Sequence, residues 1–296
     1  MRKFTPKVKK LGTSSYERLK LSQALSQAGR FDEALAELEA VLPTLPNSIY
    51  THLALGNIYL LQKRYDEALF HFQTLTDLDP LLSQGSLKTG SLYLKLGKLE
   101  LALAQFQLAL NLDPQSISVY IGMGQLCVKK QQYEAAIQNF LQVVKLNSEM
   151  IFGYILLAET YNKQKKISLA IEQLQTALKI KPNLLLAHVR LGRLYLQRKN
   201  HRIARKYFQQ AIDLNPFSIE AKLGLSEALI QANELKAANE IVKELPELSK
   251  QTPKKIEIFP GANDSNSKNI FDDTSSLELI LYSYALEEQE RYLSEE

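Results

Sequence analysis

The 296-residue chain contains one cysteine, no tryptophan and no long hydrophobic run. A single cysteine, Cys127, excludes an internal disulfide and favours a reducing compartment. No stretch approaches the roughly 18 apolar residues that a membrane span needs. The first residues, MRKFTPKVKKLG, are basic but lack the apolar stretch of a signal peptide. We therefore expect a soluble, cytoplasmic protein.

Arrangements of catalytic or metal-binding residues are also absent from the sequence. The four histidines, His52, His71, His188 and His201, show no metal-ligand spacing, and there is no HExxH motif or glycine-rich phosphate loop. We expect these histidines to have packing or surface roles. The sequence predicts no enzyme, no cofactor and no metal site.

The net charge of +4 is small, but it is unevenly distributed. Residues 1–14 carry five basic groups and no acid, which predicts a disordered basic arm. Residues 253–296 carry 4 basic and 10 acidic groups. The chain therefore has a basic beginning and an acidic end on either side of a mildly basic body.

The body repeats one pattern every 34 residues. In residues 83–116, Gly90, Tyr93, Ala102 and Phe106 are followed by a closing proline, Pro114. Equivalent residues return 34 positions before and after, and such self-similarity indicates a repeat architecture. The predicted repeats are 15–48, 49–82, 83–116, 117–150, 151–184, 185–218 and 219–252.

Each repeat predicts two amphipathic helices joined by a short polar turn, because its apolar residues recur three, four and seven positions apart. We expect prolines from Pro46 onward to stop the second helices. Serines at Ser48, Ser116 and Ser218 are expected to cap the next helices.

Small residues at fixed positions predict close contacts between the paired helices. One position is alanine in every repeat, from Ala34 to Ala238, and another is mostly glycine. A glycine inside a helix costs about 1 kcal/mol relative to alanine, so its recurrence indicates helices too close for a side chain. Cys127 replaces a core tyrosine of this pattern, so we expect it to be a small buried residue.

These features resemble the tetratricopeptide repeat family over residues 15–252. The resemblance implies an all-α, right-handed α-solenoid of seven helix-turn-helix repeats, whose first helices line a concave groove that binds peptides. The family's common tryptophan is absent here. Its site holds Arg18, His52, Ser86, Tyr120, Tyr154, His188 and Lys222.

The residues after the repeats predict a flexible linker at 253–275 and an extra helix at 276–296. Ser275 and Glu278 form a capping-box pattern at the start of this acidic amphipathic helix. Two roles remain open: the helix covers an apolar end of the solenoid, or it occupies the groove.

Carried over from the family residue by residue, the groove is expected to be basic with an apolar floor. Lys95, Lys129 and Lys163 also lie in last turns of helices, where a cation is favourable without any ligand. The predicted partner-binding residues are Asn57, Lys88, Lys95, Gln125, Lys129, Phe152, Lys163, Arg190 and Arg193.

We expect a protein-binding scaffold, adaptor or assembly factor whose partner is an acidic or amphipathic protein segment. One alternative is a nucleic-acid-associated protein that uses the basic arm and groove. Another is an assembly chaperone for a larger complex, including a membrane or photosynthetic complex. The lysine and asparagine pairs that clamp terminal carboxylates in chaperone-binding members are matched only at Asn57, which disfavours that partner class.

Overall fold

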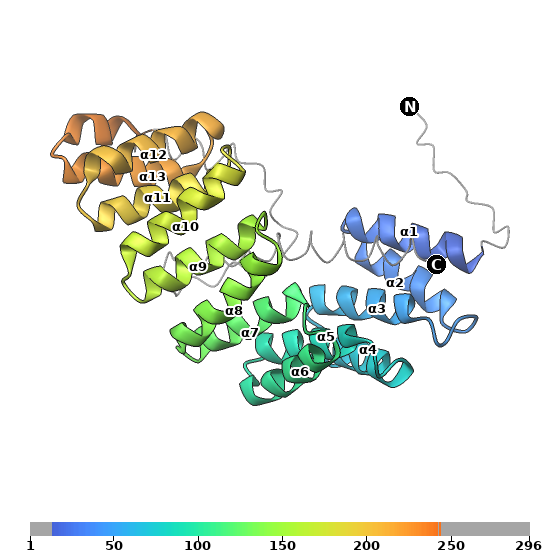
Figure 1. The fold of residues 1–296 in the computed structure, drawn as a ribbon. Coiled ribbons are helices and arrows are strands. Elements are labelled where there is room, and N and C mark those ends of the chain that lie inside the picture. The colour runs from blue at the N-terminus through green and yellow to red at the C-terminus, as the bar shows by residue number, and fades with distance from the viewer. Residues whose placement is uncertain (1–13, 242, 244–296) are drawn as a thin grey trace, which may run out of the picture. The chain divides into compact units, whose positions relative to one another are not determined.

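A computed structural model of the chain describes residues 14–241 and 243. The predicted arm, apart from Ser14, the predicted linker 253–275 and the predicted helix 276–296 lie outside the described residues. All regular secondary structure in the described part is α-helical (Figure 1). This confirms the prediction of an all-α repeat fold.

The helices follow one another in pairs, and we call the members of each pair the first and the second helix. The first helices are α1 (Ser15–Gln27), α3 (Ile49–Leu61), α5 (Ser83–Lys95), α7 (Ile117–Lys129), α9 (Ile151–Lys163), α11 (Leu185–Gln197) and α13 (Ile219–Gln231). The second helices are α2 (Phe31–Val41), α4 (Tyr65–Leu78), α6 (Leu99–Leu112), α8 (Tyr133–Leu146), α10 (Ile167–Ile180) and α12 (His201–Leu214). Residues 235–241, which follow α13, are helical as well.

The described helices form two compact units. Unit 1 contains α1–α6 and unit 2 contains α7–α13. Within each unit, a second helix packs against its own first helix and against the first helix of the next pair, as α2 does with α1 and α3. Such stacking of each hairpin against its neighbours is the packing of a solenoid.

Glycines of the first helices lie against phenylalanine rings of the second helices. A Cβ atom added at Gly192 would lie 2.7 Å from Cε1 of Phe208, and one added at Gly90 would lie 2.9 Å from Cδ1 of Phe106. Both rings are fully buried. The close approach that the glycine spacing predicted is therefore confirmed.

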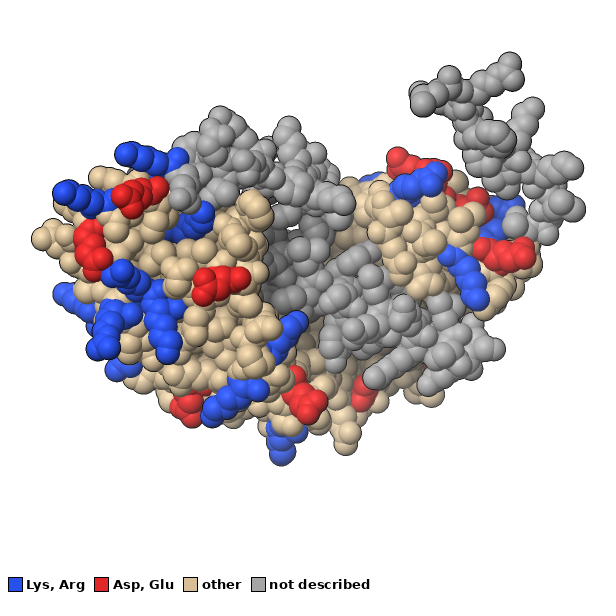
Figure 2. Space-filling model, turned by 90° about the horizontal axis from the view of Figure 1, so that it is seen from above, with Lys and Arg blue, Asp and Glu red and all other residues tan. Residues whose placement is uncertain are grey.

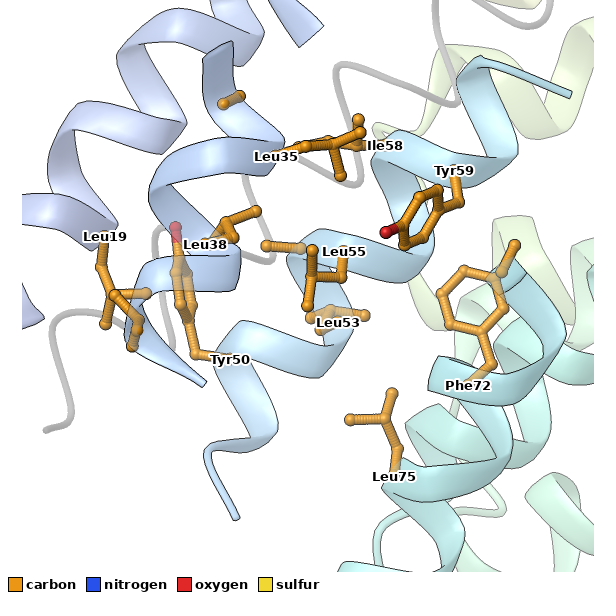
Figure 3. Close-up of a cluster of buried hydrophobic side chains, with 14 of the residues drawn as sticks. Leu19, Leu35, Leu38, Tyr50, Leu53, Leu55, Ile58, Tyr59, Phe72 and Leu75 are labelled. Carbon is orange, nitrogen blue, oxygen red and sulfur yellow. The ribbon is translucent and has the colours of Figure 1, made fainter. Parts of the chain in front are cut away.

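Repeats without this glycine also lack the phenylalanine. Ala158 stands at the glycine position of its repeat, and Leu174 stands at the phenylalanine position. Ser22 and Leu38 form the corresponding pair of the first repeat. All four are buried, so small and large residues alternate to keep the contact filled. Figure 3 shows part of this core in unit 1, including Leu38, Leu55 and Phe72.

Capping and proline residues determine where the helices begin and end. Ser48 and Ser218 accept hydrogen bonds from backbone N–H groups of α3 and α13, which confirms these two predicted caps. Ser116 makes no side-chain cap on α7, so that prediction is wrong. The helix α2 ends at Val41, earlier than a stop at Pro46 would require, because Pro43 follows closely and cannot continue a helix.

The turn within each pair contains a residue with a left-handed backbone. Gly29 and Gly97 adopt φ values of 73° and 74°, which glycine adopts without steric cost. The equivalent position in the other described turns is not glycine. It is occupied by Lys63, Gln131, Lys165, Lys199 and Asn233.

Candidate partner-binding surface

In unit 1, the predicted binding residues lie on the solvent-facing side of the first helices. Asn57 on α3 and Lys88 on α5 are half-buried, and Lys95 at the end of α5 is exposed. The buried residues of the same helices, such as Leu53 and Leu87, anchor them in the core. Unit 1 therefore presents these three side chains from helices of fixed position.

In unit 2, the predicted residues lie on α7, α9 and α11. Gln125 is half-buried, and Lys129 and Lys163 are exposed in the last turns of α7 and α9. Arg190 and Arg193 are half-buried on α11. We call the surface formed by these residues, Glu159 on α9 and Glu220 on α13 the first-helix face of unit 2.

The two arginines of this face form ion pairs with acids on neighbouring first helices. Nη2 of Arg190 lies 2.8 Å from Oε1 of Glu159 on α9. Nη2 of Arg193 lies 2.8 Å from Oε1 of Glu220 on α13. The side chains are only 24% and 23% exposed in the first pair, which limits screening by water. The face therefore has alternating charge at α11, where the sequence predicted positive charge alone.

The sequence prediction missed these acidic partners. Glu159 stands 31 residues before Arg190, and Glu220 stands 27 residues after Arg193. Neither separation equals the 34-residue repeat, so the repeat spacing alone did not indicate these pairs. They form because stacking brings neighbouring first helices side by side.

Phe152, one of the predicted partner-binding residues, is only 7% exposed. Tyr50 occupies the equivalent position in its repeat and has the same exposed fraction. Tyr16, at the equivalent position of the first repeat, is 55% exposed, because no described repeat precedes it. The ring of Phe152 therefore offers little surface to a partner in this structure.

Two of the histidines contact each other in unit 1. Nδ1 of His52 lies 2.9 Å from Nδ1 of His71, and Nε2 of His52 lies 2.9 Å from the carbonyl oxygen of Pro46. The ring of His71 also stacks on Tyr59, with centroids 5.5 Å apart. Both histidines are buried, so of the packing or surface roles that we expected, these two have packing roles.

In other repeats, different kinds of residues occupy these two positions and also contact each other. In the first repeat, Arg18 forms a 2.7 Å ion pair with Glu37. In the sixth, the ring of His188 lies 6.0 Å from that of Tyr207. In each pair, the first residue stands at the position of the family's tryptophan, and the second stands 19 positions later. In these repeats, pairs of polar or aromatic side chains thus take the place of the tryptophan side chain.

Cys127 is buried on α7, as the sequence predicted. Burial raises the pKa of its thiol, so the thiolate form is disfavoured. Among the described residues, no cluster of three or more histidine, cysteine, aspartate or glutamate side chains has the arrangement of a metal site. No helix of this part is both long and apolar enough to cross a membrane.

Helical hairpins that stack in this way define a helical-repeat protein. Models of the tetratricopeptide repeat match residues 25–86 and 195–254, and also 117–150 and 153–184. A TPR repeat model matches residues 90–130. The chain belongs to the tetratricopeptide repeat family.

Solved structures of repeat proteins share this fold. A chain of the APC/C hetero-tetramer Cut9–Hcn1 has a TM-score of 0.61 at 19% identity, with 73% of this chain and 43% of that chain covered. This chain therefore spans less than half the length of that one.

Two further structures are covered almost completely. The pilF protein of Pseudomonas aeruginosa has a TM-score of 0.57 at 18% identity, covering 70% of this chain and 95% of that one. TTC0263, a TPR protein of Thermus thermophilus, has a TM-score of 0.55 at 23% identity, covering 62% and 100%. At these identities the likeness shows the fold alone. Among curated proteins, none matches the chain.

Proposed function

We propose that the chain is a non-catalytic cytoplasmic scaffold, an adaptor or assembly factor, that binds an acidic or amphipathic segment of a partner protein along its first helices. Tetratricopeptide repeat proteins generally mediate protein–protein interactions. The observation that carries the proposal is the row of half-exposed polar and charged side chains on successive first helices of each unit. These helices are held by a buried core, so the protein loses little conformational entropy on binding.

The chemistry of unit 2 supports a partner segment that carries carboxylates. Lys129 and Lys163 project from the ends of α7 and α9. Arg190 and Arg193 lie nearby on α11, each beside a carboxylate of the protein itself. A guanidinium group has five N–H donors, so Arg190 or Arg193 can bind a carboxylate of the partner beside the protein's own carboxylate. The half-buried Glu159 then keeps its counter-charge on binding.

A synthetic peptide of residues 276–296 provides an acidic amphipathic probe for this surface. We expect Lys129→Glu/Lys163→Glu to weaken its binding on the order of tenfold, from lost and reversed ion pairs. The matched control is Lys145→Glu/Lys179→Glu, which makes the same charge changes in last turns of the second helices α8 and α10. Fluorescence anisotropy with the labelled peptide measures both affinities.

The control separates the proposed face from general electrostatics. A selective loss in the first-helix variant supports the proposal. Equal losses in both variants would show that net charge alone attracts the peptide, and an unchanged affinity in the first-helix variant would remove these lysines from the binding surface. A steep salt dependence together with tighter binding of DNA would favour the nucleic-acid alternative.

The chain's own acidic segment is a candidate competitor for the same surface. The predicted linker 253–275 provides about 23 residues, enough for a flexible chain to reach back over the repeats. Deleting 276–296 should then raise the affinity for the peptide. An unchanged affinity would contradict this occupancy, and a lower melting temperature after the deletion would support a capping role instead.

A further inference from the structure

The turns between first and second helices differ in charge from repeat to repeat. In five of the seven repeats, the five residues after the first helix include one acid. In the turns from α9 to α10 and from α11 to α12, residues 164–168 and 198–202 include no acid. These two turns carry Lys165, Lys166, Arg198, Lys199 and Arg202, a group that we call the basic edge.

Hydrogen bonds show that successive turns of a unit lie beside one another. Nε2 of Gln164, in the turn after α9, donates to Oε1 of Glu134 at the start of α8, at 2.6 Å. The equivalent bond in unit 1 joins Gln62 to Asp32 at 2.8 Å. The acidic position of this bond holds Ser168 on α10 and Arg202 on α12. The acid of this position is therefore absent from α10 and α12, while Glu134 lies beside Gln164 and Glu234 pairs with Arg205 of α12.

All five residues of the basic edge are exposed. Within the described part of the chain, no residue of the basic edge forms an ion pair. Figure 2 shows Lys and Arg side chains gathered on the left of the molecule, where α10–α13 lie. The positive charge of these turns is thus available to a partner.

One feature of these turns is unfavourable for folding and adds positive charge. Arg202 lies in the first turn of α12, where the helix dipole favours acids and disfavours cations. The equivalent positions of the first four repeats hold Asp32, Asp66, Glu100 and Glu134. The other cations follow the pattern of the chain: Lys63 shares the left-handed backbone of Lys165 and Lys199, and Arg30, Arg64 and Lys98 precede their second helices as Lys166 does. The absence of acids therefore distinguishes the basic edge from the other turns.

We propose that the basic edge binds the anionic headgroups of a phospholipid membrane surface. An array of exposed, flexible cations can neutralise such a surface without a complementary pocket, with about a fivefold gain in affinity for each Lys or Arg. Leu169 and Leu235, which are 39% and 54% exposed, lie in the first turns of helices that start at the same edge. These side chains can enter the headgroup region, where apolar groups are favourable.

The same turns are less suited to nucleic acid. Single-stranded nucleic acid is usually bound by basic residues interleaved with exposed aromatic rings that stack on bases. The exposed aromatic residues of the described chain are Tyr16, Phe70 and Phe217, and none lies in these two turns. The surface therefore offers charge and aliphatic groups, which match lipid headgroups better than bases.

Co-sedimentation of the full chain with phospholipid vesicles tests the proposal. We expect binding to phosphatidylcholine vesicles that contain phosphatidylserine and none to phosphatidylcholine alone. Lys166→Glu/Lys199→Glu should weaken that binding about 25-fold or more. The matched control, Lys98→Glu/Lys63→Glu, makes the same changes at the equivalent positions of unit 1 and should keep the affinity of the native chain.

A second variant separates charge from folding. Lys165→Gly/Lys199→Gly should raise the melting temperature, because glycine tolerates the left-handed backbone, and should still weaken vesicle binding. The proposal is overturned if the native chain does not prefer phosphatidylserine vesicles or if the unit 1 control loses as much binding. It is also overturned if duplex DNA binds more tightly than the vesicles and with the same sensitivity to Lys166→Glu/Lys199→Glu, which would assign the edge to nucleic acid.

Discussion

At the residue scale, the contacts of His52 determine which ring nitrogens of His52 and His71 carry a proton. The carbonyl oxygen of Pro46 can only accept, so Nε2 of His52 must carry the proton that it donates. Neutral His52 then accepts at Nδ1, and Nδ1 of His71 must donate to it. The hydrogen bonds of the pair are thus satisfied with both rings neutral.

This arrangement makes unit 1 sensitive to acid. Burial, with a smaller contribution from His52, lowers the pKa of His71 from 6.5 to about 4. The unfolded chain thus binds a proton more readily than the folded chain, so His71 contributes stability above pH 6.5 that is lost as the pH falls towards 4. At about pH 5 we expect a free energy of unfolding lower by about 2 kcal/mol than at about pH 7 from this residue alone. Urea denaturation at the two pH values measures it.

His71→Tyr is the control, because Tyr207 occupies the equivalent position beside His188. The tyrosine variant should lose most of the difference in stability between the two pH values that His71 contributes. If wild type and variant lose the same stability on acidification, His71 is not the group responsible.

The sequence allowed the burial of Cys127 to be predicted but not the contact between His52 and His71. Burial follows from the repeat, because the position of Cys127 is tyrosine in four other repeats and leucine in the first and last. The histidine contact depends on how one helix of a hairpin is rotated against the other, which a 34-residue spacing does not specify. Arg18 and Glu37, with opposite charges at the same separation of 19, were the available signal.

At the element scale, the contact between a small and a large residue holds each hairpin together. Gly192→Ala would place a Cβ atom 2.7 Å from the ring of Phe208. We expect the variant to lose about 1–3 kcal/mol of unfolding free energy from overpacking. Adding Phe208→Leu should restore part of this loss, because it recreates the Ala158 and Leu174 pair of the preceding repeat. Thermal melting of the single and double variants tests this, and absence of rescue would place the strain elsewhere.

The ion pairs between first helices make a separate prediction about binding. Glu159→Gln removes the carboxylate that competes with a partner for Arg190. We expect the affinity for the acidic peptide 276–296 to rise by a few-fold, since an exposed or half-exposed pair contributes about 0.2–1 kcal/mol. Glu172→Gln, an exposed residue of the second helix α10, is the control. A weaker affinity in Glu159→Gln would mean that Glu159 positions Arg190 for the partner.

Helix positions were predictable from the sequence, while some helix ends were not. The residues before Pro80, Pro114 and Pro182 are extended, as the steric effect of proline requires. In the first repeat a second proline, Pro43, ended α2 before the position that the repeat predicts. The charge of the first-helix face was only partly predictable, because side-chain pairing between repeats depends on their stacking.

At the scale of the whole molecule, the described helices divide into two units, each with its own buried core. Local destabilisation should then remain within one unit. We expect Gly192→Ala to accelerate backbone amide hydrogen exchange in α11 and α12 and to leave exchange in α1–α4 unchanged. Hydrogen exchange followed by mass spectrometry resolves these segments. Faster exchange in both units would show that the chain unfolds as one cooperative body.

Binding of partners on the first helices can be measured by hydrogen exchange of the full chain with and without the acidic peptide 276–296. The chain that lacks 276–296 is measured in parallel to remove competition. We expect slower exchange in the first helices α7, α9 and α11 on peptide binding and no change in the second helices α8, α10 and α12. Protection confined to the second helices, at a concentration where the peptide is bound, would show that partners do not bind on the first helices.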